Sequence, residues 1–322
     1  MKLSIITINY NNASGLRKTL VSVAAQTYRD IEHIIVDGGS TDGSVDIIRE
    51  YAEDQTSNIK HQTSHIVKWV SEKDKGIYNA MNKGIEIALG RRIVNSFNRS
   101  ELVEEDYHTP YTVHRTPSQS DCDYIQILNS GDCVAAPDTI ERVMGVLDQT
   151  SNLQLLLGNI VKIYPDGRKL SEKKGRANSS QPIPLDTSML TFYRGTVPQD
   201  AAFVRRDLFE KYGLFDDKLK IVSDWKLYLS MIALGDVQPM YVDVDVVLFD
   251  MTGISNANIE RRNAEKRAYL EEILPTSVLK DYDKYYFPIE QYDRLKRHHM
   301  WGLVWFMERV LFKFEKWHIL RK

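Results

Sequence analysis

Short apolar runs alternate along the first third of the chain with segments in which apolar residues recur at helical spacing. The runs of strand length are residues 3–8, 31–39 and 68–76, and the first two end in clusters of turn residues. The helical segments are residues 16–26, 40–54 and 77–90. Strands that alternate with helices predict an α/β fold built on a mainly parallel, twisted sheet.

Residues 91–122 interrupt this alternation, because they are polar, contain two prolines and lack a clear period. We interpret them as an insertion that either forms a lid or decorates a sheet edge. The sheet resumes with an apolar run at 124–128, which ends in the turn Asn-Ser-Gly-Asp. Further on, the pattern predicts a helix, a hairpin, two helices and a strand, at residues 137–149, 153–170, 207–213, 223–235 and 239–249.

Residues 300–322 are amphipathic when wound as a helix. One face carries Leu303, Phe306, Met307, Val310, Leu311, Phe314 and Trp317, and the opposite face carries Arg309, Lys313 and Lys316. Such a pattern is typical of a helix that lies in the plane of lipid headgroups. Packing on the protein's own core, or on a second copy in a homo-oligomer, stays open. No window holds the roughly 18 uncharged apolar residues that cross a bilayer.

Composition is that of an ordinary soluble globular protein, with 43% apolar and 27% charged residues among 322. The formal net charge of -2 gives no overall basic field for a nucleic acid partner. Cys122 and Cys133 flank an extended run, too far apart to bridge, so we expect reduced thiols and a cytoplasmic setting, on the inner face of the membrane if the last helix binds lipid. The first residues do not resemble a secretory signal.

Carboxylates follow three of the predicted strands. Asp37, Asp74 and Asp132 each stand where a strand ends, and ligands of parallel sheets bind at that edge. Converging carboxylates suit a hard divalent cation, Mn²⁺ or Mg²⁺, which leaves coordination sites for the phosphates of a substrate. The sequence contains neither of the common glycine-rich phosphate-binding patterns. Handling of phosphate through a metal fits that absence.

Five blocks, in order, give the sequence a recognisable character: SIITINYNN, IIVDGGSTDGS, DKGIYNAMNKGI, LNSGD and SDWKLYL. Together they resemble the inverting glycosyltransferases of family 2, of the kind that builds bacterial polysaccharides. The resemblance implies a GT-A, Rossmann-like fold. It also implies transfer of a hexosyl or N-acetylhexosaminyl group from a nucleotide sugar, commonly a UDP-sugar, to a hydroxyl of a glycan or lipid-linked acceptor. We expect the catalytic domain over residues 1–255 and a helical extension over residues 256–322.

The resemblance also assigns roles to individual residues. Tyr10 would stack on the base, Asp37 would accept a hydrogen bond from uracil, and Asp132 would bind the metal. The other residues implied in nucleotide binding are Thr7, Asn11, Asp74, Lys75 and Asn129. Competing roles stay open, since Tyr10 could plug the core, Asp37 could cap a helix and Lys75 could be a solvated surface residue.

Asp224 stands where the family places its catalytic base, which takes the proton of the attacking hydroxyl. It could instead cap the helix that follows, as could Ser223. Relatives often carry a histidine before this block, where the present chain has Gln199 and Asp200. These two would contact the donor sugar or the acceptor, although Asp200 could instead be structural. The segment 249–262 could close over the donor, with Gly253, Ser255, Arg261 or Arg262 meeting its phosphates.

Two other functions fit part of the pattern. A sugar nucleotidyltransferase shares the architecture but needs a basic, glycine-rich loop after its first strand, where this chain has NYNNASGL. A non-catalytic scaffold that only binds a nucleotide sugar would explain the altered metal motif NSGD and the missing histidine.

Overall fold

The structure of the chain is a computed structural model that describes residues 1–57, 65–92, 95–97, 122–173, 181–251, 258–298 and 300–319. The described residues form two units, 1–266 and 267–322. Most of the expected insertion 91–122, and Gly253 and Ser255 of the expected closing loop, lie outside the described residues. The expected domain boundary after residue 255 stays a prediction, since residues 252–257 lie outside them too.

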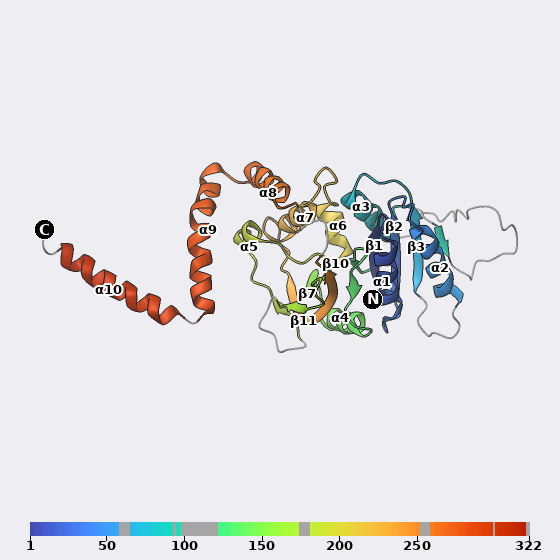
Figure 1. The fold of residues 1–322 in the computed structure, drawn as a ribbon, viewed down its shortest axis with the longest axis horizontal. Coiled ribbons are helices and arrows are strands. Elements are labelled where there is room, and N and C mark those ends of the chain that lie inside the picture. The colour runs from blue at the N-terminus through green and yellow to red at the C-terminus, as the bar shows by residue number, and fades with distance from the viewer. Residues whose placement is uncertain are drawn as a thin grey trace. The chain divides into compact units, whose positions relative to one another are not determined.

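The strands of the described residues are β1 (Leu3–Asn9), β2 (Ile31–Asp37), β3 (Ile66–Ser71), β4 (Asn95–Phe97), β5 (Tyr124–Ile127), β6 (Cys133–Val134), β7 (Leu155–Ile163), β8 (Lys169–Glu172), β9 (Ile183–Pro184), β10 (Ala202–Arg205) and β11 (Met240–Asp250). They form one sheet in the order β4-β3-β2-β1-β5-β10-β7-β11-β6, with β8 beside β7 and β9 beside β11 (Figure 1). The pairs β3-β2, β2-β1 and β1-β5 are parallel. Beyond β5 antiparallel pairs predominate, because β10 runs against both of its neighbours.

The helices are α1 (Ala13–Ala24), α2 (Ser44–Ser57), α3 (Ile77–Ala88), α4 (Thr139–Gln149), α5 (Met189–Arg194), α6 (Arg206–Tyr212), α7 (Ser223–Ile232), α8 (Ile259–Ile273), α9 (Thr276–Arg297) and α10 (Trp301–Ile319). None of these described helices has the length and hydrophobicity needed to cross a membrane. The α/β class is confirmed, with three successive parallel pairs in the N-terminal half of the sheet and one further parallel pair, β7-β11, in the other half.

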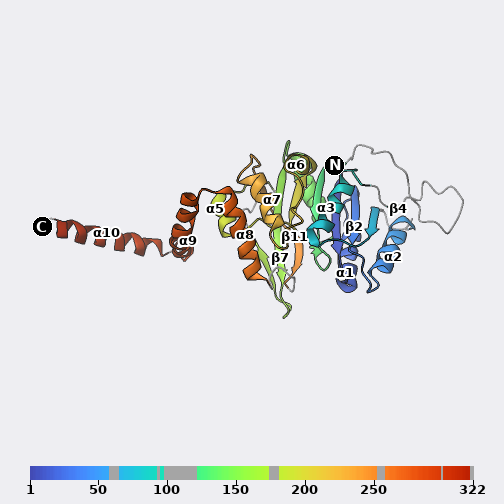
Figure 2. The same ribbon diagram turned by 90° about the horizontal axis from the view of Figure 1, so that it is seen from above.

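Side chains of the buried strands point alternately to the two faces of the sheet. Helices cover both faces (Figures 1 and 2). Ile5 joins a core that includes Val23 of α1 and Ile140 of α4, whereas its neighbour Ile6 faces α3. All seven residues of β1 are buried, and so are all seven of β2. A strand covered on both sides is mostly apolar, which is why the apolar runs 3–8 and 31–39 predicted these strands correctly.

Several short elements escape the sequence pattern. β10, β9 and α5 lie in segments that show no strand or helix period over enough residues. The run that begins at Tyr124 leaves the sheet after Ile127, and residues 133–134 pair with β11 instead. The predicted hairpin 153–170 forms as β7 and β8, with Gly167 at φ +82° in its turn. The polar turn 129–132 therefore separates two different strand pairings.

Gly84 allows α3 to approach β1 closely. A Cβ atom at this position would lie 2.3 Å from Cγ2 of Ile6, whose side chain is fully buried. We expect Gly84→Ala to destabilise the protein by about 1–3 kcal/mol in urea unfolding, although alanine is the better helix former. Gly145→Ala on α4 is the matched control, because no neighbouring atom lies within 4 Å of its added Cβ. Equal stability changes for the two variants would contradict this account of the packing.

Candidate functional site

A cleft of about 890 Å³ opens where β1 and β5 end, at the carboxyl edge of the parallel strands. It is lined by segments from the whole of the first unit, between Ile8 and Asp250. Its wall contains seven of the residues predicted for the site: Tyr10, Asp74, Asn129, Asp132, Gln199, Asp200 and Asp224. Residues more than 200 positions apart in sequence therefore meet in one cavity.

The other four predicted residues do not line the cleft. Thr7 is fully buried, and its hydroxyl is 3.0 Å from Nε2 of His33 on β2. Asn11 has φ +47°, and its side-chain oxygen accepts the N–H of Thr41. Lys75 is exposed, with its backbone carbonyl accepting a hydrogen bond from the Lys220 ammonium. Asp37 is the fourth.

Asp37 is buried and its carboxylate is occupied by its own neighbourhood. It accepts hydrogen bonds from Asn9, from the hydroxyls of Ser40 and Ser71, and from the backbone N–H groups of Gly39 and Ser40. Burial raises the pKa of Asp37, but these donors outweigh it and leave that pKa below its ordinary value. The carboxylate fixes the turn that follows β2.

That turn sets one wall of the cleft. Gly38 lies so close to Tyr10 and Asp74 that an added Cβ would be 2.5 Å from a carboxylate oxygen of Asp74 and 3.1 Å from a ring carbon of Tyr10. The Tyr10 side chain remains 65% exposed, so it does not plug the core. An exposed ring at the rim of a polar cleft is a suitable surface for stacking a flat ligand.

The turn that carries Asp132 is hydrogen-bonded to Thr19 of α1. The Thr19 hydroxyl accepts the N–H of Gly131 at 2.9 Å and donates to the Asp132 carbonyl at 2.7 Å. Gly131 has φ +109°, a conformation that favours glycine. The side chain of Asp132 accepts the N–H of Asp250 at 3.0 Å. Burial, and then the nearby Asp250 carboxylate, raises the pKa of Asp132 to about 7.

Asp200 faces the same interior. Its carboxylate accepts a hydrogen bond from the Asn129 amide at 2.9 Å, while the other end of that amide, Oδ1, is buried without a partner in the described part of the chain. Burial raises the pKa of Asp200 well above its ordinary value, and the carboxylates of Asp132 and Asp224 raise it further. The Asn129 oxygen and this set of acids favour a cation between them.

Asp224 lies in the first turn of α7 without capping it, since Val222 is the N-cap and makes no side-chain cap bond. Its carboxylate accepts a hydrogen bond from the Tyr78 hydroxyl at 2.9 Å. Burial raises the pKa of Asp224, and the N–H of Trp225, the Tyr78 hydroxyl and the Lys266 ammonium partly offset that rise. The carboxylate is thus a base whose proton affinity exceeds that of an ordinary aspartate.

Sequence reasoning missed three residues around these acids. Asp250 is the last residue of β11, so the strand-end rule that identified Asp132 could also have predicted it from the sequence. Tyr78 stands inside the block DKGIYNAMNKGI, where nothing marks it as a partner of Asp224. Lys266 belongs to the polar helix α8, and its proximity to the site arises only from tertiary packing.

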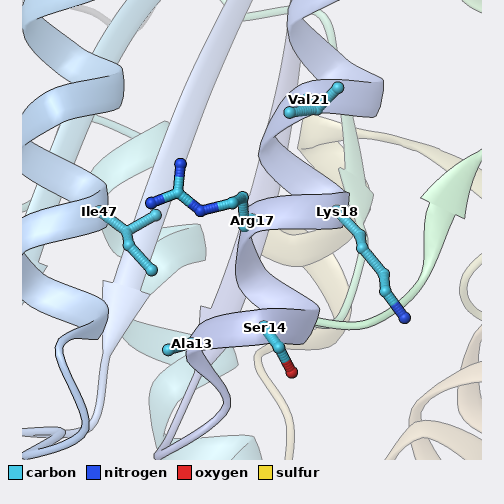
Figure 3. A pocket seen from close by; sticks show the side chains of 6 residues that line it. All are labelled: Ala13, Ser14, Arg17, Lys18, Val21 and Ile47. Carbon is cyan, nitrogen blue, oxygen red and sulfur yellow. The ribbon is translucent and has the colours of Figure 1, made fainter.

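A second hollow, of about 720 Å³, lies between α1 and α2 and has a different character. Figure 3 shows Arg17 and Lys18 leaving α1 on opposite sides there, with Ala13, Ser14, Val21 and Ile47 completing the lining. None of these six residues is acidic. The chemistry therefore concentrates in the first cleft, whose wall Lys18 also reaches.

Comparison with known proteins agrees with this geometry. Residues 4–96 match the model of Glycosyl transferase family 2. An uncharacterized glycosyltransferase of Mycobacterium tuberculosis is 26% identical over 255 residues, covering 79% of this chain and 77% of the relative. A PGL/p-HBAD biosynthesis glycosyltransferase of Mycobacterium bovis is 25% identical over 260 residues, covering 80% of each.

These matches support the identification of the chain as a family 2 glycosyltransferase. Its fold is also that of S. aureus TarS 1-349 in complex with UDP, with a TM-score of 0.54 at 15% identity, covering 86% of this chain and 68% of that one. The GT-A fold and transferase activity expected from the five sequence blocks are confirmed. The two cysteines, Cys122 and Cys133, both lie in the described residues and are not joined by a disulfide.

The raised pKa of Asp132 predicts how this glycosyltransferase responds to pH in a metal-free buffer. The unfolded carboxyl ionises near pH 4 and the folded one near pH 7, so above pH 7 the folded state bears the cost of a buried charge. We expect Asp132→Asn to stabilise the protein at pH 8 by about 1–3 kcal/mol, and the gain to vanish as the pH falls toward 4.

The measurement is urea unfolding with a chelator present, at pH 4, 6 and 8. Asp138→Asn is the control, because Asp138 is exposed and makes no side-chain cap bond. If Asp132→Asn instead lost stability at pH 8, hydrogen bonds to the ionised Asp132 carboxylate would outweigh the cost of its burial, and this account would be wrong.

Proposed function

We propose that this glycosyltransferase moves a hexosyl or N-acetylhexosaminyl group from a UDP-sugar to a hydroxyl of a glycan or lipid-linked acceptor, with inversion at the anomeric carbon. The supporting observation is the cleft that unites the exposed ring of Tyr10 with the buried acids Asp132 and Asp224. These are the groups that a base, a metal-bound diphosphate and an attacking hydroxyl require. S. aureus TarS, alike in fold, has been solved with UDP and with UDP-GlcNAc, which supports a uridine nucleotide.

The nucleoside would lie against the wall that Asp37 organises. Tyr10 stacks on the base, a contact worth about 1–3 kcal/mol, and Asp74 lies beside it for the ribose. Asp37 holds the Gly38–Ser40 turn that shapes this pocket, and Thr7 and Asn11 support the same wall from the core and the turn. Lys75 is exposed and does not line the cleft, and we propose that it contacts the bound nucleotide from outside.

The residues present fit a divalent cation, Mn²⁺ or Mg²⁺. Asp132 and Asp250 would hold it, with the unpartnered oxygen of Asn129 close by. No three Asp, Glu, His or Cys side chains within the described ranges could hold a metal by themselves. Oxygens of the donor diphosphate would therefore complete the shell, and the bound cation would neutralise charge on the departing UDP.

Asp224 is our candidate for the base. Ionised, it takes the proton of the acceptor hydroxyl as that oxygen attacks the anomeric carbon and the bond to UDP breaks. The Tyr78 hydroxyl donates to the carboxylate and fixes its orientation. Gln199 and Asp200 also line the cleft, and we assign to them contacts with the transferred sugar.

The first test pairs binding with turnover. We expect UDP with Mn²⁺ to raise the melting temperature of the wild type and of Asp224→Asn alike, while Asp224→Asn lowers kcat about 10²–10⁴-fold, the usual contribution of a general base. Asp132→Asn is expected to lose the Mn²⁺-dependent part of the UDP shift. Full transfer by Asp224→Asn would remove the proposed base, and UDP binding that ignores Mn²⁺ would remove the metal.

We also propose that α10 rests on an anionic membrane surface, where a lipid-linked acceptor would be found. Its exposed side chains include Leu303, Trp305, Phe306, Met307, Leu311 and Phe312. Residues 294–322 carry eight Lys and Arg against two Glu, although the whole chain has a net charge of -2. This local excess of positive charge beside exposed aromatic residues favours lipid over a second copy of the chain.

Flotation on vesicles tests the membrane contact. We expect the full chain to float with vesicles that contain phosphatidylglycerol, and a variant with Leu303, Phe306 and Leu311 all changed to Ser to stay in the dense fraction. Val21→Ser is the control, since Val21 is an exposed apolar residue of α1, outside this helix. Equal flotation of the triple variant, or a concentration-dependent dimer that α10 substitutions abolish, would assign the helix to another role.

A further inference from the structure

Two neighbours on α8 reach the segment that carries Asp224. The first half of α8 lies beside the start of α7 (Figures 1 and 2). The Glu265 carboxylate accepts the N–H of Ile221 at 3.0 Å and the N–H of Lys220 at 3.1 and 3.2 Å. Arg261, one turn earlier on α8, holds the same carboxylate through a 3.0 Å ion pair. A side chain from elsewhere in the chain thus fixes the loop directly before the proposed base.

Glu265 anchors the residues directly before α7, whose N-cap, Val222, makes no side-chain cap bond. The N–H groups that its carboxylate accepts belong to Lys220 and Ile221, just before the first turn of the helix. A carboxylate near a helix N-terminus also interacts favourably with the helix dipole. These donors lower the pKa of Glu265, although burial by itself would raise it. Glu265 therefore stays ionised and anchored.

Lys266 reaches the other side of α7. Its ammonium donates to the carbonyl of Gly195 at 3.0 Å and lies 5.1 Å from the ring centre of Trp225. Trp225 in turn donates its indole N–H to the carbonyl of Phe192 at 2.8 Å. Gly195 ends α5 and begins the stretch that leads to Gln199 and Asp200. The ammonium thus joins that stretch to the residue that follows Asp224.

Charged and titratable groups face Asp224 from four elements. Tyr78 comes from α3, Asp200 from the stretch before β10, Tyr228 from α7 itself and Lys266 from α8. Lys266 is the one cation among these described neighbours, and Arg262 is the other charge that acts on it. Burial lowers the pKa of Lys266 to about 8 and the charge of Asp224 counters that effect. Below pH 8 Lys266 is therefore mostly charged, next to Trp225, the residue that follows Asp224.

We propose that Lys266 and Glu265 are positioning residues for Asp224: Lys266 holds the carboxylate in its ionised form, and Glu265 holds the backbone that carries it. Neither side chain lines the cleft, so neither touches substrate. The inference rests on the proposed role of Asp224 as the base. It adds α8, a polar helix with few signs of function in its sequence, to the machinery of proton transfer.

Two substitutions of Lys266 separate its charge from its hydrogen bond. Lys266→Gln keeps an N–H donor for Gly195 but removes the charge, whereas Lys266→Arg keeps both. We expect the acid limb of the kcat profile to move up by about one pH unit in Lys266→Gln and to stay in place in Lys266→Arg. The shift arises because Asp224 then gains its proton at a higher pH. Lys226→Gln is the matched control, because Lys226 lies on α7 but pairs with Asp216.

Glu265→Ala tests the second residue. We expect kcat to fall about tenfold with the acid limb and the donor KM unchanged, since only the backbone before Asp224 is released. The melting temperature of each variant identifies any that does not fold, and the Gln and Arg variants of Lys266 are compared at matched folded fractions. An acid limb in Lys266→Gln that coincides with that of the wild type would reduce Lys266 to a packing residue.

Failure of the proposed function looks different. If Asp224→Asn retains transfer, Asp224 is not the base, and the positioning role of Lys266 and Glu265 is refuted with it. If Asp224→Asn is inactive while Lys266→Gln keeps the wild-type acid limb, the base stands and only its dependence on α8 is refuted.

Discussion

The structure depends on keeping several carboxylates in one poorly solvated cleft. Asp132, Asp200, Asp224 and Asp250 all line it, and like charges that are removed from water repel each other strongly. Burial and mutual repulsion together raise the pKa of Asp132 and Asp200. A nucleotide diphosphate would add more negative charge to the same space. The cation that we propose for this cleft would offset that repulsion.

The scaffold limits this electrostatic cost by supplying donors from separate elements. Thr19 of α1 secures the turn of Asp132, and Tyr78 of α3 donates to Asp224. By contrast, Asp37 collects five hydrogen bonds and makes the pocket wall rigid. The acids thus divide into one that is saturated and structural and others that retain capacity for ligands. Degree of hydrogen bonding, more than position at a strand end, distinguishes the two kinds.

Sequence patterns predicted the elements that bury a continuous or periodic apolar surface. β1 and β2 were predicted because both of their faces are covered, and α7 because its apolar spacing is helical. β10 and α5 were missed, since four and six residues are too few to show a period. The strand-end rule selected Asp37, Asp74 and Asp132, of which Asp74 and Asp132 line the cleft. The rule could not reveal that the carboxylate oxygens of Asp37 are already hydrogen-bonded within the protein. Two of the donors, Asn9 and Ser71, come from neighbouring strands and so depend on tertiary structure.

The pairing of β6 with β11 has a consequence for the folding of the enzyme during its synthesis. Cys133 and Val134 lie beside Leu248 and Val247, so the residues right after Asp132 are joined to nearly the last strand of the catalytic unit. During synthesis the nucleotide-facing wall around β1 to β3 can be complete while this edge is still without its partner. The cleft is accordingly completed late, and a chain shortened before β11 would keep β1 to β3 but lack the wall that carries Asp250.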